Sequence, residues 1–202
     1  MFDEFSVAFT PYDPTADTKY APHWYNDATD AKEVTEIRVQ KDTEGNVIDN
    51  KSGLRFKGYI EYTYKTDEKL TEYGFIVART DVLKAADNAE LTHTFKPEGV
   101  VTPFISHANY IKGTDTDLKL YPDSTLQADV FSCVLVNIPM AHYGDEFTVR
   151  AWSKVDGEYQ YGTSMSVSII DILNSLDDER KAAAQPLIDN YNEWLASQST
   201  EG

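Results

Sequence analysis

Residues 146–161 constrain the fold of this chain more than any other stretch. From Phe147 to Val155 every second residue is apolar or small, and polar residues or tryptophan stand between them. This period of two is typical of a β-strand that packs one face on a core. Asp156 and Gly157 then supply the two positive-φ positions of a type I′ turn. The stretch therefore predicts a β-hairpin within an antiparallel sheet.

Strand-like patterns recur along the rest of the chain. In the run that begins at Leu54, Gly58 lies on the apolar face, which indicates a bulge or a close approach of another part of the chain. The run 73–79 is apolar on both faces, as in a strand that is covered on both sides. The polar residues 41–46 predict a turn between two short strands. The other expected strands or strand pieces cover residues 5–9, 34–39, 47–48, 54–64, 91–95, 100–105, 118–121 and 126–138.

Three segments have helical character. Thr80 or Asp81 can cap a short helix over residues 82–86. Farther along, alternation gives way to a continuous apolar run near Ser168, where we expect a strand to become a helix. Pro186 lacks an amide hydrogen and clashes with the preceding turn, which predicts either two short helices or one kinked helix at the C-terminus.

The C-terminal segment carries an apolar stripe at helical spacing. The stripe comprises Leu187, Ile188, Tyr191, Trp194 and Leu195. Such a stripe is typical of a helix that packs one face against the rest of its fold. We expect it to dock on the sheet, and a surface for a partner molecule is the alternative.

Together these elements predict a mainly β protein, an antiparallel β-sandwich (Ig-like) with short helices and a C-terminal helical appendage. A length of 202 residues suits one large domain. We assign residues 1–174 to the β-sandwich domain, including a long aromatic loop at residues 11–32. Residues 175–202 form the helical appendage packed on it.

The chain is strongly acidic, with 34 Asp and Glu against 18 Lys and Arg and a net charge of −16. Such a charge repels the phosphates of nucleic acids and anionic lipids, so we expect neither as a partner. No apolar run approaches the ~18 residues of a membrane-spanning helix, and we expect no membrane insertion. The first residues lack the basic and apolar regions of a signal peptide, so either the protein is made without one or the sequence was cut after it.

The cysteine and histidine residues do not indicate a reactive or metal-binding site. Cys133 lies in an apolar run and is expected to be a small buried side chain, not a reactive thiol. The histidines lie in four separate segments, without the spacing of a zinc site. They are His23, His93, His107 and His142.

The acidic clusters also lack a recognisable site. Residues 41–46 and 115–117 do not match the oxygen spacing of a calcium-binding loop, so we expect solvated turns there. No nucleophile elbow or nucleotide-binding glycine loop occurs. A pair of glycosidase carboxylates would leave no local signature and stays open. We therefore expect a protein that is not an enzyme, with no cofactor, no metal and no catalytic residue.

Aromatic side chains are the candidate ligand-binding residues, because sugars stack their C–H faces on exposed rings. The five candidates are Trp24, Tyr25, Trp152, Tyr159 and Tyr161. Trp152 lies on the face of its strand opposite Phe147, so it is either exposed or covered by the appended helix or the 11–32 loop. We favour cover, because a bare tryptophan beside tyrosines would form a sticky patch.

Four short motifs occur in an order that resembles a family of secreted modules. They are Gly53-Leu-Arg-Phe56, Glu72-Tyr-Gly-Phe-Ile-Val77, Phe147-Thr-Val-Arg-Ala-Trp152 and Tyr161-Gly-Thr-Ser-Met-Ser-Val-Ser168. Over roughly residues 50–175 the chain resembles the β-sandwich modules of cell-surface and dockerin-bearing proteins of gut clostridia. The resemblance implies an extracellular, non-catalytic module, and it assigns no functional residues.

One departure from that family concerns the start of the chain. The family's modules lie inside long secreted chains, whereas this chain begins at a methionine. We expect either an excised piece or a free-standing relative, such as a virion surface protein of a phage that infects these bacteria.

We therefore expect a non-catalytic, surface-exposed module that binds or spaces, located outside the cell or on its surface. Its partner would be a protein or a glycan at a cell or particle surface. Two alternatives are a decoration or structural protein of a phage virion, and a glycan-binding module that uses exposed aromatic side chains.

Overall fold

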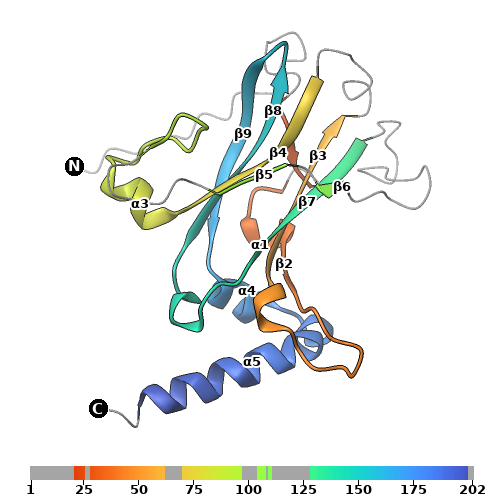
Figure 1. The fold of residues 1–202 in the computed structure, drawn as a ribbon, viewed down its shortest axis with the longest axis vertical. Helices are drawn as coiled ribbons and strands as arrows, with labels where there is room; N and C mark the ends of the chain where they lie inside the picture. The colour runs from red at the N-terminus through yellow and green to blue at the C-terminus, as the bar shows by residue number, and fades with distance from the viewer. Residues whose placement is uncertain are drawn as a thin grey trace.

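The fold consists of two antiparallel sheets and several helices (Figure 1). The structure is a computed structural model, which describes residues 21–25, 28–61, 70–96, 104–107, 109–110 and 128–199. This part of the chain has a mixed α/β structure. The prediction of antiparallel sheets with helices is confirmed, and the helical share is larger than a mainly β chain would have.

The first sheet is built around the long pair of strands β3 (Gly53–Glu61) and β7 (Ala128–Val136), whose register is continuous. Strands β1 (His23–Trp24) and β2 (Thr35–Arg38) both pair with β3, at different points along it. Strand β6 (Asn109–Tyr110) pairs with β7. A hairpin between 34–39 and 47–48 was expected, but only a single bridge from Lys41 to Val47 forms, because β2 pairs with β3 instead.

The second sheet has the strand order β5-β4-β8-β9. Its bounds are Phe104–His107 for β5, Leu70–Arg79 for β4, Phe147–Val155 for β8 and Glu158–Val167 for β9. The predicted hairpin is confirmed: β8 and β9 pair directly, and Asp156 and Gly157 between them have φ angles of 51° and 87°. Both faces of β8 are largely buried, so the polar-looking face of the pattern is covered as well.

Side chains from both sheets meet in one core. Phe75 of β4 lies 4.9 Å from Phe131 of β7, measured between ring centroids, and 5.8 Å from Trp24 of β1. Gly58 sits beside this contact: a Cβ there would lie 3.0 Å from the carbonyl oxygen of His23 and 3.2 Å from Phe75. Gly58 therefore marks a close approach and not a bulge, because the β3–β7 register runs through it without a shift.

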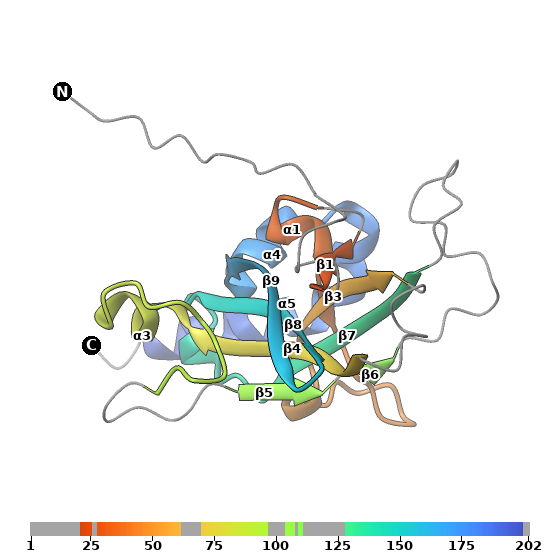
Figure 2. The same ribbon diagram turned by 90° about the horizontal axis from the view of Figure 1, so that it is seen from above.

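One side of this core is closed by the segment that includes β1 and helix α1 (Ala31–Val34). Figure 2 shows both elements beside β9. The indole nitrogen of Trp24 donates a hydrogen bond to the carbonyl oxygen of Thr163 on β9, over 3.0 Å. The described part of the predicted 11–32 loop thus contains strand β1 and the start of helix α1, because Trp24 lies in the core and Tyr25 packs against it.

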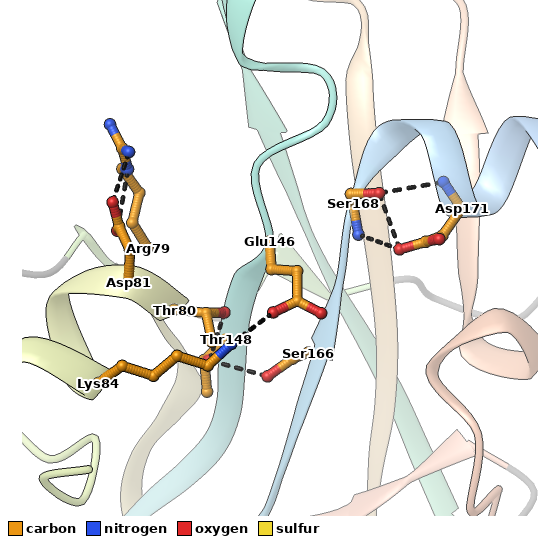
Figure 3. Close-up of polar contacts among 9 residues, drawn as sticks. All are labelled: Arg79, Thr80, Asp81, Lys84, Glu146, Thr148, Ser166, Ser168 and Asp171. Atoms are coloured by element: carbon orange, nitrogen blue, oxygen red, sulfur yellow. Dashed lines mark hydrogen bonds and ion pairs between the residues drawn. The ribbon is translucent and has the colours of Figure 1, made fainter.

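Helix α3 (Thr80–Ala85) begins earlier than predicted and has no side-chain cap. The Thr80 hydroxyl lies instead 2.8 Å from that of Thr148, which in turn lies 2.8 Å from that of Ser166 (Figure 3). Asp81 also does not cap the helix; it pairs with Arg79 over 2.6 Å. The hydroxyl of Thr80 is therefore used to join α3 to strands β8 and β9.

Two remaining sequence expectations concern the segment after α3 and the single cysteine. Residues 91–95 were expected as a strand but form bends and turns. Cys133 is buried at 2% exposure on β7, as predicted for a small core side chain. The expected strands at 5–9 and 118–121 and the acidic turn at 115–117 lie outside the described residues.

The change from strand to helix near Ser168 is confirmed. Strand β9 ends at Val167, and helix α4 (Ile169–Ser175) follows directly. The Ser168 hydroxyl accepts a hydrogen bond from the amide of Asp171, and the Asp171 carboxylate accepts one from the amide of Ser168 (Figure 3). This reciprocal capping box fixes the start of α4.

Replacing Ser168 by alanine should lower the free energy of unfolding by about 1 kcal/mol, because the amide of Asp171 loses its acceptor. Chemical denaturation followed by circular dichroism measures the loss. Ser175→Ala, at the other end of the same helix, should cost no more than about 0.5 kcal/mol. Equal effects of the two changes would contradict a specific role for the cap.

Helix α5 (Asp178–Gln198) runs through Pro186 without ending there, so of the two predicted alternatives a single helix forms and two short helices do not. Asp177 caps its start by accepting a hydrogen bond from the amide of Arg180. Figure 1 shows α5 crossing below the ends of the sheets, with its C-terminal turns leading away from them. The assignment of residues 175–202 as a separate appendage stays a prediction.

The apolar stripe of α5 divides into two parts. Leu187 is 1% exposed and belongs to the core shared by the sheets, and Tyr191 stacks on Tyr143 at 5.1 Å. Trp194 is half-buried and stacks on Tyr191, while Leu195 is 42% exposed. The N-terminal part of the stripe therefore docks as predicted, and the C-terminal part reaches the surface.

A charged triad lies between β2 and β3. Glu36 binds Arg55 over 2.7 Å and Lys57 over 2.8 Å. Partial burial by itself would raise the pKa of Glu36, but hydrogen bonds and charges from Lys57 and Arg55 hold this pKa below its usual value near 4.5. A carboxyl group whose pKa is lower in the folded state stabilises that state above the unfolded pKa, and this contribution is lost as the pH falls through the folded pKa.

Glu36→Gln should therefore lower the free energy of unfolding by about 1 kcal/mol at neutral pH, and the difference from the wild type should shrink below pH ~4.5. Urea denaturation of both proteins across this pH range measures the difference. Lys57→Gln should give the same pH profile because it removes a partner of the same carboxylate. A difference that does not change with pH would rule out the ion pairs as its cause.

Candidate functional site

The five candidate ligand-binding residues lie in two places. Trp24 and Tyr25 lie at β1, where Trp24 is 4% exposed and Tyr25 packs, half-buried, against the core. Trp152, Tyr159 and Tyr161 lie together on β8 and β9, where Trp152 is 1% exposed. Neither tryptophan presents a ring face to solvent, so these two candidates are not open to stacking by a sugar.

The second place is an aromatic cluster on the outer face of β8 and β9, formed by His93, Trp152, Tyr159 and Tyr161. The His93 ring stacks on Tyr159 with 3.8 Å between centroids and 16° between planes. It also meets Trp152 edge-on at 4.7 Å. The Tyr161 hydroxyl accepts a hydrogen bond from the amide of His93 and lies 2.7 Å from Nδ1 of the same residue. His93 thus ties the turn segment after α3 to the sheet.

Cations lie against the two tyrosine rings of this cluster. The guanidinium of Arg150 lies 4.7 Å from the centre of the Tyr161 ring, and Lys154 Nζ lies 5.4 Å from that of Tyr159. Arg150 is held there by Glu90, over 2.6 Å, and by the carbonyl oxygen of Gly162. Burial raises the pKa of Tyr161 by more than the His93 amide and Arg150 lower it, so the hydroxyl stays protonated at neutral pH.

The aromatic cluster is best explained as a packing arrangement in which the other three rings help to cover Trp152. Tyr159 is 40% exposed, but His93 lies on its ring and Lys154 lies near it. Trp152 itself packs with Leu83 of α3 and with Leu91. Cover of Trp152 was predicted, but from the C-terminal helix or the 11–32 loop. It comes instead from residues 80–95, because the turns after α3 fold back over β8.

A second candidate site is a groove between α4 and α5 with a volume of about 260 Å³. Its apolar lining combines α4 with the side of α5 that carries Ile188, and Lys181 adds a positive charge. The lining residues are Ile170, Leu173, Asn174, Leu176, Lys181, Ile188, Tyr191 and Asn192. We define the helical surface as this groove together with Trp194 and Leu195.

The helical surface was only partly foreseen from the sequence. The stripe on α5 was recognised, and a partner surface was the alternative considered for it. The contribution of α4 was missed, because the apolar run after Ser168 was interpreted only as the place where a strand becomes a helix. In the structure Ile169 and Ile172 are buried, whereas Ile170 and Leu173 are partly exposed on the groove side. A helical spacing drawn through residues 169–173 would have separated the two faces.

The acidic turn at residues 41–46 is organised by hydrogen bonds within the turn. The Asp42 carboxylate accepts hydrogen bonds from the amides of Glu44 and Asn46 and from the Asn46 side chain. These bonds, first that of the Asn46 side chain, lower the pKa of Asp42. In the part of the chain that the structure describes, no three His, Cys, Asp or Glu side chains are grouped as a metal site would require. The described helices also include none that is both long and apolar enough to cross a membrane.

Comparison with known proteins gives no relative for this chain: no family model, no curated protein and no solved structure matches it.

Proposed function

We propose that this protein is a non-catalytic, surface-exposed β-sandwich module of the Ig-like type, which binds or spaces through contacts with protein. The observation that carries the proposal is the helical surface. There a groove is lined by Ile170, Leu173 and Ile188. Leu195, one helical turn beyond the lining residue Tyr191, is exposed. Adjoining apolar side chains at a protein surface are typical of contact sites for other proteins.

The sandwich description is supported by the packing of the sheets. Both are antiparallel, and Phe56 and Phe131 of one share a core with Phe75 and Val149 of the other. Such a core, between the inner faces of two sheets, is the basis of sandwich domains. Chains of this type frequently serve as modules whose ends and loops make the contacts, and here α4 and α5 lie at one end of the sheets.

A protein partner is better supported than a glycan. A sugar needs an open ring face, but the rings of Tyr159 and Tyr161 already contact His93, Lys154 and Arg150. The helical surface instead offers apolar side chains between polar ones, as the centre of a protein interface does. The proposed location is outside the cell or on its surface, and a phage virion is the alternative with the same need for protein contacts.

The test uses the immobilised full chain and an extract of surface proteins from gut clostridia. Asn192 is exposed and lines the groove, so Asn192→Arg fills the groove without disturbing the core. Ala182→Arg adds the same charge to an exposed position of α5 outside the groove and is the matched control. We expect the wild type and Ala182→Arg to retain one or more proteins that can be identified. Asn192→Arg should not retain them.

Equal retention by all three proteins would overturn the helical surface as the binding site. A saturable change in tryptophan fluorescence with a plant or microbial glycan would favour the glycan-binding alternative.

A further inference from the structure

We draw no further inference here: the strongest candidate, the apolar groove between α4 and α5 with the exposed Leu195 beyond it, carries none, because nothing in the structure shows what covers this face.

Discussion

Trp152→Ala should lower the free energy of unfolding by about 3 to 5 kcal/mol, although the sequence pattern offers Trp152 as a ligand-binding residue. Trp152 is 1% exposed and packs with Ile76, Leu83 and Leu91. Removing the indole leaves a cavity in which these side chains lose their contacts, and the surrounding strands can collapse only in part. The effect is therefore on stability.

Denaturation with guanidinium chloride, followed by circular dichroism, gives the size of this loss. Trp194→Ala is the matched control, because Trp194 is half-buried near the exposed end of α5 and should cost only about 1 kcal/mol. Trp152→Phe keeps most of the apolar volume, so its loss of unfolding free energy should lie between those of Trp152→Ala and Trp194→Ala. A small loss for Trp152→Ala would mean that the turns after α3 do not hold Trp152 in a packed core.

Leu187→Ala should lower the free energy of unfolding by about 2 to 5 kcal/mol and should loosen α5 first. Leu187 is 1% exposed within the core that the two sheets share, and Ala184, one turn earlier, is also buried. The stacking of Tyr191 on Tyr143 is the next contact along the helix. With the Leu187 side chain truncated, the docked half of α5 retains few contacts with the sheets. The helix should then loosen, because an isolated helix of this length has little stability in water.

Hydrogen exchange separates local from global effects of this change. In Leu187→Ala, the amides of α5 should exchange faster than those of β3 and β7, in addition to the lower global stability. Leu195→Ala is the control on the same helix. It should change the stability by no more than about 0.5 kcal/mol, because Leu195 is 42% exposed. If the amides of α5 exchange no faster in Leu187→Ala than in the wild type, Leu187 is not the residue that holds the helix on the sheets.

The local elements of this protein follow closely from its sequence. The β8–β9 hairpin needs a period of two and the turn pair Asp156-Gly157, and both are readable from neighbouring residues. The change from strand to helix at Ser168 is likewise marked by where the apolar residues cease to alternate. The close approach at Gly58 is indicated by a glycine on an apolar face. The hairpin and the helix start depend on interactions within a few residues along the chain, whereas the partners of Gly58, His23 and Phe75, are distant in sequence and come from the tertiary structure.

Predictions that depend on contacts between distant segments were less successful. Residues 91–95 alternate as a strand would, yet Leu91 and His93 contact Trp152 from a turn. Thr80 is a good capping residue by type, but its hydroxyl binds Thr148, 68 positions away in the chain. Pro186 lies inside α5, since the buried neighbours Ala184 and Leu187 fasten the helix on both sides of it. In each case a tertiary contact outweighs the local preference.

The sequence by itself determined that this chain forms antiparallel strands and that a tight turn joins two of them in a hairpin. It also determined that a helix with an apolar stripe follows the strands. Those features depend on periodicity and turn chemistry, which act between neighbouring residues. Only the tertiary structure decided which aromatic side chains are buried and which apolar side chains reach the surface. Burial is set by what packs on top of a strand or helix. For Trp152 that cover comes from residues 80–95, and for the C-terminal half of α5 the described structure leaves Leu195 exposed beside the α4–α5 groove.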